Sequence, residues 1–229
     1  MEVSAYNISK VFHRRRGGTN VFTAVEPCSL TLPAGRLTVI GGRSGSGKST
    51  LLNMLAGILT PENGRVFYDG KDIYAMPDSD LSAFRGGNIG YIPQGRSAVS
   101  SLTVLENILL PLTLCREEGK DRALELMRRF GIQELRDVLP EKLSGGELRR
   151  MAIARAMMRS PKVLFADEPT GDLDDDNTRT VFRTLREIAE AGTAVLTVTH
   201  DEEAASYADR IYRMDAGRLE VADAAGEAV

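Results

Sequence analysis

Gly42-Arg43-Ser44-Gly45-Ser46-Gly47-Lys48-Ser49 matches the phosphate-binding pattern GxxxxGK[ST] at every fixed position, and Thr50 follows it. Glycine permits a tight backbone curl because it has no Cβ, and a curled backbone turns its N–H groups toward an anion. Lys48 supplies a positive charge for the β- and γ-phosphates, and the Ser49 hydroxyl is a ligand for Mg²⁺. The stretch predicts a nucleoside triphosphate site at residues 42–50. A glycine- and serine-rich turn that happens to contain a lysine is the alternative.

The flanking residues have the secondary structure that this motif requires. Residues 36–40 indicate a buried strand, and residues 48–57 place Leu51, Leu52 and Leu55 on one face of a helix. A strand, a loop and a helix in this order put the phosphates at a helix N-terminus, where free N–H groups and the helix dipole favour negative charge.

Length, composition and charge are those of an ordinary globular chain. The 229 residues suffice for a substantial core without disulfides, and 42% hydrophobic with 27% charged residues is typical of soluble proteins. A net charge of −3 argues against a broad nucleic-acid surface, so we expect no nucleic-acid partner. No apolar stretch is long enough to span a membrane, and the N-terminus lacks the apolar core of a signal peptide. Cys28 and Cys115 are expected to be reduced thiols of a cytosolic protein.

Strand and helix patterns alternate in a way that predicts an α/β fold. Strands are expected at residues 2–8, 28–32, 36–40, 65–68, 89–92, 163–166, 194–199 and 210–214. Helices are expected at residues 48–57, 117–130, 144–158, 176–191 and 201–207, with another that begins at Thr103 and ends or kinks at Pro111. Such alternation implies a mostly parallel sheet covered by helices. We expect one domain over residues 1–229, with a helical subdomain at about residues 95–158 inserted in the α/β core.

Two carboxylates follow the buried apolar strand at residues 163–166. Asp167 stands where P-loop proteins place the acid that helps hold Mg²⁺. The adjacent Glu168 can accept a hydrogen bond from water and orient that water toward the γ-phosphate. Two acids at a solvated strand end are the alternative, but the phosphate loop upstream favours a catalytic pair.

The segment Leu143-Ser144-Gly145-Gly146-Glu147 is a capping box that starts a helix. Each glycine inside a helix costs about 1 kcal/mol relative to alanine. That cost is explained if the backbone must come close to an anion, because a helix N-terminus with bare amides and a serine hydroxyl favours one. A plain helix start is the alternative.

The phosphate loop, the LSGGE segment, the run Asp167-Glu168-Pro169-Thr170 and the later His200 occur in the order of an ABC-type ATPase subunit, which the chain resembles over nearly its whole length. This resemblance implies a P-loop NTPase core, an antiparallel β subdomain and a helical insertion. It also implies ATP hydrolysis with Mg²⁺ as the cofactor.

The resemblance assigns roles to residues that would otherwise be ordinary. Ser49, Gln94 and Asp167 are implied to hold Mg²⁺, with Gln94 also linking the attacking water to the helical insertion. His200 resembles the histidine that contacts the γ-phosphate. The further residues that it implies are Asp174, an acid of a loop that crosses a dimer interface, and Phe12, an aromatic that stacks on adenine.

The resemblance further implies two partners. A second copy packs head to tail, so that each ATP lies between one phosphate loop and residues 144–147 of the other copy. Residues 102–108 and 110–112 resemble the lipoprotein-release and macrolide-export branch, whose subunits sit on the inner face of the membrane under a separate integral membrane permease. Residues 95–101 depart from that branch, and they lie in the segment that usually faces the transmembrane partner.

Two other functions compete with a transport ATPase. A soluble ABC ATPase of an assembly complex, for example cluster assembly, would carry the same motifs without a membrane partner. A GTPase or small-molecule kinase is disfavoured for two reasons. The chain lacks the guanine-recognition motif Asn-Lys-x-Asp, and such enzymes do not require an LSGGE segment.

Overall fold

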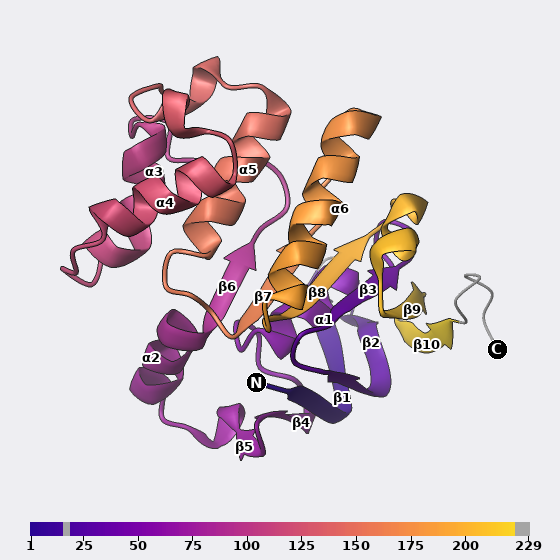
Figure 1. The fold of residues 1–229 in the computed structure, drawn as a ribbon. Helices are drawn as coiled ribbons and strands as arrows, with labels where there is room; N and C mark the ends of the chain where they lie inside the picture. The colour runs from indigo at the N-terminus through magenta and orange to yellow at the C-terminus, as the bar shows by residue number, and fades with distance from the viewer. Residues whose placement is uncertain (16–18, 223–229) are drawn as a thin grey trace.

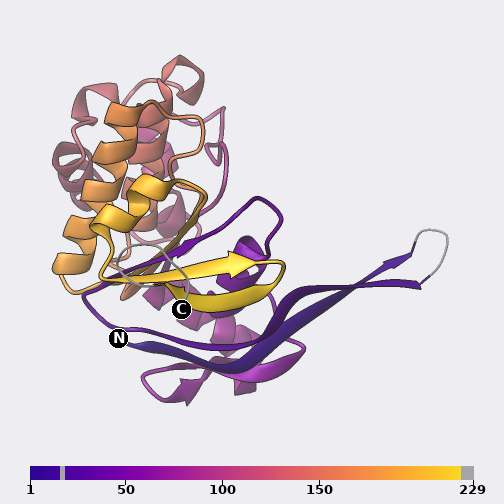
Figure 2. The ribbon, with the colours of Figure 1, turned by 90° about the vertical axis from the view of Figure 1, so that its right-hand side faces the viewer.

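The computed structural model describes residues 1–15 and 19–222, which form two sheets and a separate layer of helices (Figure 1). The four-stranded antiparallel sheet has the order β2-β1-β4-β5. Its strands are β1 (Val3–Arg15), β2 (Thr19–Leu32), β4 (Asn63–Tyr68) and β5 (Lys71–Asp72). Beyond the body of the molecule β1 and β2 continue as a two-stranded arm (Figure 2).

The six-stranded sheet has the order β10-β9-β3-β8-β7-β6. Neighbouring strands from β9 to β6 are parallel, and β10 is antiparallel to β9. The strands are β3 (Leu37–Gly41), β6 (Ile89–Ile92), β7 (Val163–Asp167), β8 (Ala194–Thr199), β9 (Arg210–Asp215) and β10 (Arg218–Ala222). This mostly parallel sheet is the platform on which the phosphate loop sits.

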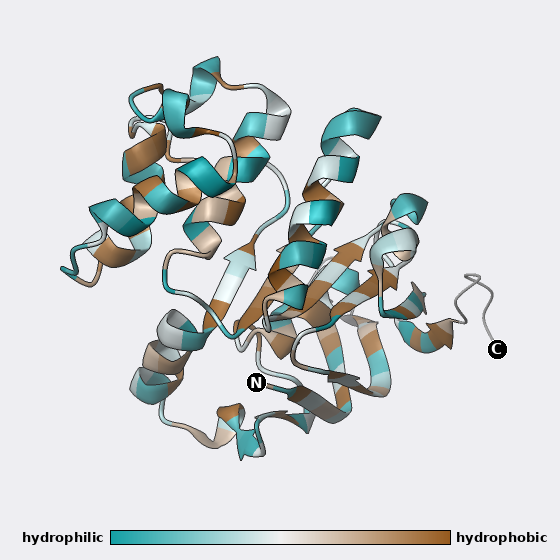
Figure 3. Ribbon diagram, viewed as in Figure 1, coloured by the Kyte–Doolittle hydropathy of each residue, from teal (hydrophilic) through white to brown (hydrophobic). Residues whose placement is uncertain are grey.

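Apolar side chains cover both faces of the central strands, as expected of a parallel sheet between helices. Along β3, Val39 packs toward the helical layer and Ile40 packs toward the antiparallel sheet. Along β7, Leu164 and Phe165 divide in the same way. The central strands are accordingly brown in the hydropathy view, whereas α6 carries teal and brown residues on different faces (Figure 3).

Helices occupy four positions around this sheet. The helix α1 (Lys48–Leu55) lies between the two sheets and contacts strands of both, and α6 (Asp175–Glu190) covers the opposite face of the large sheet. The helix α2 (Asp78–Asn88) leads into β6. A separate layer contains α3 (Val104–Thr113), α4 (Lys120–Arg129) and α5 (Gly145–Ala156), which pack on one another (Figure 1). Short 3₁₀ turns lie at Ile73–Ala75 (η1), Gln133–Leu135 (η2), Pro140–Lys142 (η3) and Glu202–Tyr207 (η4).

The structure departs from the sequence expectations mainly at element ends. The first strand runs to Arg15 rather than to residue 8, and the second begins at Thr19 rather than at residue 28, because the two pair along the whole hairpin. Pro111 does not end α3, which continues to Thr113. The helix α2 and the strands β5 and β10 were not anticipated. Within the described residues, no helix has the length and apolar character needed to cross a bilayer.

Candidate functional site

The predicted catalytic and Mg²⁺-binding residues lie at the carboxyl ends of four adjacent strands. The phosphate loop follows β3, His200 follows β8, Asp167 ends β7, and Gln94 lies two residues beyond β6. These strands are parallel neighbours in the order β3-β8-β7-β6, so their carboxyl ends meet at the same edge of the sheet. Such an edge is where ligands bind in open α/β sheets.

Backbone packing explains two glycines of the phosphate loop. A Cβ on Gly42 would lie 2.2 Å from the carbonyl oxygen of Met214, and a Cβ on Gly47 would lie 2.2 Å from that of Ala24. Both glycines have positive φ, 152° and 108°, which other residues rarely adopt. The loop is therefore held closely between β9 and β2, and Gly47 leads directly into α1.

The middle of the loop faces outward, and the Ser46 hydroxyl inside the loop has no partner. Arg43, Ser44 and Gly45 are exposed, and the Ser46 N–H donates to the Arg43 carbonyl oxygen at 3.2 Å. The Ser46 hydroxyl is buried and has no hydrogen-bond partner among the described residues. Because buried polar groups normally find a partner, this unused hydroxyl fits a loop built to take a polar ligand.

Lys48 lies inside the loop, with only 5% of the residue exposed. Its Nζ donates to the carbonyl oxygens of Gly42 at 2.6 Å and Arg43 at 3.0 Å, and lies 3.4 Å from Oε1 of Glu168. An ionised phosphate oxygen is a stronger partner for an ammonium than a neutral carbonyl is. The lysine is therefore placed to exchange these carbonyls for a phosphate.

The side-chain oxygens of Ser49 and Asp167 lie close enough together to bind one Mg²⁺ ion. The Ser49 hydroxyl donates to Oδ1 of Asp167 at 2.9 Å. Adjacent ligands of an octahedral Mg²⁺ with bonds of about 2.1 Å lie about 3 Å apart, so both oxygens fit the ion. Among the described residues no three His, Cys, Asp or Glu side chains form a metal site by themselves. The remaining ligands would have to be the predicted Gln94, phosphate oxygens and water.

The electrostatics around Asp167 also favour a cation. Burial raises the pKa of Asp167 above its ordinary value, the hydrogen bond from Ser49 lowers it, and the neighbouring carboxylate of Glu168 raises it again. The charge of Lys48 lowers the pKa of Asp167 only as the smallest of these effects. A buried carboxylate that is weakly compensated gains from a bound divalent cation.

Glu168 is fixed by contacts with β8 and with His200, which follows that strand. Its backbone has a positive φ of 46°, and its N–H donates to the Val198 carbonyl oxygen at 2.9 Å. Its Oε2 lies 2.9 Å from Nδ1 of His200 and accepts from the His200 backbone N–H at 3.2 Å. The His200 side chain is 64% exposed, so the histidine joins the buried glutamate to the outer part of the site.

A cavity of about 470 Å³ connects Gln94 with these groups. Gln94, Glu168, Thr170, His200 and Asp201 are among the residues that line it. Sequence reasoning assigned no role to Thr170 or Asp201, although each stands close to a predicted site residue. The Thr170 hydroxyl donates to Oδ2 of Asp201 at 3.2 Å, which ties the loop after β7 to the loop after β8.

The LSGGE segment forms the predicted capping box but lies apart from that cavity. The Ser144 hydroxyl accepts from the Glu147 N–H at 3.3 Å, and Oε2 of Glu147 accepts from the Ser144 N–H at 2.8 Å. Ser144 is exposed, and residues 144–147 are not among those that line the cavity. Within the described residues, no hydrogen bond joins this segment to the phosphate loop of the same chain.

Packing inside the chain supplies a reason for Gly146 that the sequence did not suggest. A Cβ on Gly146 would lie 2.1 Å from Oδ1 of Asn177. The Asn177 amide is held by hydrogen bonds to both carboxylate oxygens of Asp174, at 3.0 and 2.9 Å, so it cannot easily withdraw. At Gly145 the nearest atom is the Cδ2 methyl of Leu173, at 3.0 Å. The close approach to α6 accounts for Gly146 without any anion.

Replacing Gly146 with alanine is expected to destabilise the fold. The added methyl group meets the pinned Asn177 amide, and overpacking of this kind costs about 1–3 kcal/mol. The Gly145→Ala variant is the matched control, because the Leu173 methyl group can rotate away and alanine favours the helix by about 1 kcal/mol. Urea unfolding of both variants measures the difference. Equal stability of the two would show that the Asn177 contact does not explain the glycine.

Neither Asp174 nor Phe12 lines the cavity that contains Glu168 and His200. Asp174 is the N-cap of α6, and its Oδ1 accepts from the Asn177 N–H at 2.8 Å. That hydrogen bond lowers the pKa of Asp174. Phe12 lies on β1 opposite Phe22 of β2, with Nζ of Lys10 5.8 Å from its ring centroid. The dimer role of Asp174 and the adenine role of Phe12 stay predictions.

Comparisons with known proteins agree on one family. The family profile described as ABC transporter matches residues 25–171. The lipoprotein-releasing system ATP-binding protein LolD of Bdellovibrio bacteriovorus is 39% identical over 223 residues, which cover 93% of this chain and 98% of that protein. The macrolide export ATP-binding/permease protein MacB of Chlorobaculum tepidum is 35% identical over 217 residues, which cover 94% of this chain and 33% of that protein.

Solved structures give the same result for the fold. The structure described as the dimeric structure of MJ0796, a bacterial ABC transporter cassette, is 32% identical to this chain and superposes with a TM-score of 0.85. The match covers 96% of this chain and 98% of that one.

Proposed function

The chain belongs to the ABC transporter family, and from this premise we propose that it is an ATP-hydrolysing subunit that acts as a head-to-tail dimer beneath a separate membrane permease. The contacts that carry the proposal join the phosphate loop to the end of β7. Ser49 bonds to Asp167, and Lys48 pairs with Glu168. This group of four residues therefore contains a cation that can bind phosphate, a pair of oxygen ligands for Mg²⁺ and a carboxylate that can act as a base.

Each residue of this constellation has a separate task in the proposed reaction. Lys48 binds the β- and γ-phosphates. Glu168 holds the attacking water through a hydrogen bond and takes its proton. His200, 2.9 Å from Glu168, keeps that carboxylate oriented toward the γ-phosphate. Ser49, Asp167 and Gln94 would hold Mg²⁺, which when bound neutralises phosphate charge that develops during cleavage.

The position of the signature segment supports a second copy as the partner. Ser144 is exposed, and its segment contributes nothing to the cavity that holds Glu168. A nucleotide on this phosphate loop is therefore left without a signature segment from its own chain. A relative of high structural similarity is described as dimeric. In the proposed dimer, residues 144–147 of one copy close over the ATP on the other copy.

The membrane partner is supported by the names of the relatives. LolD is named as the ATP-binding protein of a lipoprotein-releasing system. The chain matches a third of the length of MacB, which is named as an ATP-binding/permease protein. The LolD match, which covers nearly all of both chains, supports an ATP-binding subunit on the inner face of the membrane that acts with a separate permease. Purification with a polytopic membrane protein would support this placement, and purification with a purely soluble complex would favour the assembly ATPase.

Replacing Ser144 with arginine tests the composite site. The bulky cation blocks the approach of a second copy, whereas the phosphate loop of the same chain is untouched. We expect ATP to bind with unchanged affinity, while the ATP-dependent dimer and steady-state hydrolysis are lost. Size-exclusion chromatography with light scattering, isothermal titration and phosphate release measure the three quantities.

Thr103→Arg is the matched control for the Ser144 variant. Thr103 and Glu106 form the same kind of capping box at the start of α3, so this variant loses a comparable cap of about 1 kcal/mol. It should still dimerise and hydrolyse ATP. Normal dimerisation of Ser144→Arg would exclude residues 144–147 from the interface.

A further inference from the structure

Two arginines of α5 donate hydrogen bonds to the segment that carries Gln94. Arg149 donates from Nη1 to the carbonyl oxygen of Pro93 at 3.3 Å, directly before Gln94 in the chain. Arg155 donates to the carbonyl oxygen of Ser97 at 2.8 Å and also bonds to the Ser97 hydroxyl. The bonds therefore bracket Gln94, one residue before it and three residues after it.

Both guanidinium groups are held away from water by neutral partners. Arg149 is only 7% exposed, and Arg155 is half-buried. Burial lowers the pKa of both side chains, and for Arg149 the charge of Asp172 acts in the opposite direction. Removing a charge from water costs free energy that carbonyl and hydroxyl oxygens offset only in part. Core packing alone would favour an apolar side chain at these positions.

Apart from these bonds, the segment is held mainly at its two ends, by the pairing of Ile92 in β6 and by the hydrogen bonds between Val99 and Asn107. Gly95 has a positive φ of 74°, and a Cβ built on it would have no atom within 4 Å. A glycine in open space gives the backbone little restraint. In contrast, α5 is a fixed platform, because Met151, Ile153 and Ala154 are buried in the core. Within the described residues, the hydrogen bonds that residues 93–97 accept come from α5, so these bonds help to fix the position of Gln94.

Neither arginine reaches the reacting groups directly. Gln94 lines the cavity of about 470 Å³ together with Glu168 and His200, whereas Arg149 lines a different cavity of about 240 Å³ with Gly95. An effect of Arg149 on hydrolysis would therefore have to pass through the segment that contains Gln94.

We propose that Arg149 and Arg155 are positioning residues that hold Gln94 beside Glu168 by tying its segment to α5. The inference rests on the proposed function, because the position of Gln94 matters only if the chain hydrolyses ATP. Since α5 begins directly after Ser144, the same bonds link the position of Gln94 to that of the signature segment.

A double-mutant cycle between Arg149→Met and Gln94→Ala tests the proposal. Methionine fills similar space and removes the donors, although the Pro93 carbonyl oxygen then loses its partner, so thermal unfolding must show that the variant is folded. We expect kcat to fall by about tenfold to a hundredfold, as for a misplaced group, with little change in KM for ATP. In the Gln94→Ala background the same replacement should have no further effect, because coupled residues are not additive.

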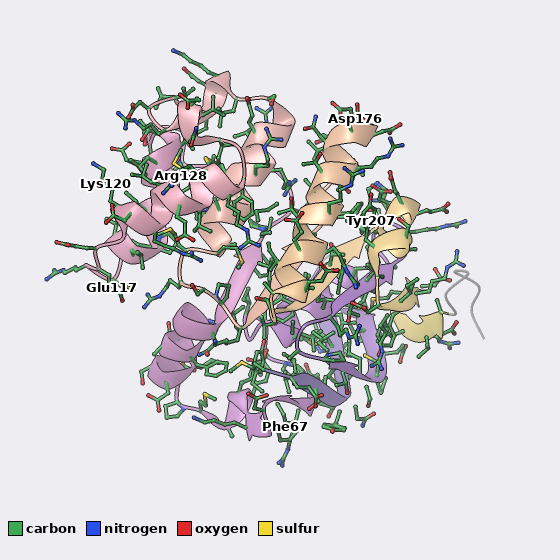
Figure 4. The ribbon with its side chains drawn as sticks, in the orientation of Figure 1. Phe67, Glu117, Lys120, Arg128, Asp176 and Tyr207 are labelled. Atoms are coloured by element: carbon green, nitrogen blue, oxygen red, sulfur yellow. The ribbon has the colours of Figure 1, made fainter. Side chains whose placement is uncertain are left out.

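Three further variants complete the experiment. Arg149→Lys should restore part of kcat, since a lysine can still donate to Pro93. Arg128→Met, on an exposed face of α4 (Figure 4), should leave kcat unchanged. Arg155→Lys provides a second cycle with Gln94→Ala if Arg149→Met does not fold. Full kcat in Arg149→Met, or a loss of equal size in the Gln94→Ala background, would overturn the proposal. An inactive wild-type protein would instead contradict the proposed function.

Discussion

Glu168→Gln is expected to stop ATP turnover while leaving ATP bound. The amide keeps the shape of the side chain and can still accept from His200, but it cannot take a proton from water. Loss of a general base lowers kcat by about 10²- to 10⁴-fold. Binding should persist, because Lys48 keeps its bonds to the phosphate loop and the pair formed by Ser49 and Asp167 is unaltered. Phosphate release and equilibrium binding of labelled ATP measure the two effects.

Glu220→Gln is the control for this variant. Glu220 is an exposed carboxylate on β10, and its replacement makes the same change of charge away from the cavity. It should hydrolyse ATP at the wild-type rate. If Glu168→Gln also did so, another group would have to act as the base, and the buried contact between Glu168 and His200 would need a different explanation.

Lys48→Ala is expected to abolish tight nucleotide binding. The ammonium is buried within the loop and binds the phosphates in the proposed function, and removing a buried charged partner costs about 2–5 kcal/mol. The dissociation constant for ATP should therefore rise by about 30- to 4,000-fold. Isothermal titration of the wild type and the variant measures this change.

Two controls separate this effect from a folding defect. The replacement also leaves Glu168 without its cation at 3.4 Å, so thermal unfolding must show that the variant is folded. Lys120→Ala, at the exposed start of α4 (Figure 4), should bind ATP as the wild type does. Unchanged affinity in a folded Lys48→Ala variant would contradict the role of the phosphate loop.

The sequence predicted the parts of the site that depend on local patterns. The glycines and lysine of residues 42–50 identified the strand, loop and helix that the structure contains. The apolar run before Asp167 identified β7. The comparisons confirm the family resemblance, and the sheets and helices confirm the α/β class. The domain boundaries at about residues 95–158 and the roles of the site residues remain predictions.

The remaining features depend on contacts between distant segments. The full length of β1 and β2 follows from their mutual pairing, which no local pattern records. Gly146 faces Asn177 of another helix, so the need for a residue without a Cβ at this position could not be predicted from residues 143–147 alone. No local sequence pattern singles out Arg149 or Arg155, and only the fold shows that they bond to the segment after β6.

The oligomeric state of the Glu168→Gln variant with ATP and Mg²⁺ tests the central claim most directly. Sedimentation and nucleotide counting on the same sample give the number of chains and of bound ATP molecules. We predict one chain without nucleotide, and two chains with two ATP molecules once nucleotide and Mg²⁺ are added. A single chain that remains monomeric with ATP firmly bound would contradict a site shared between two copies.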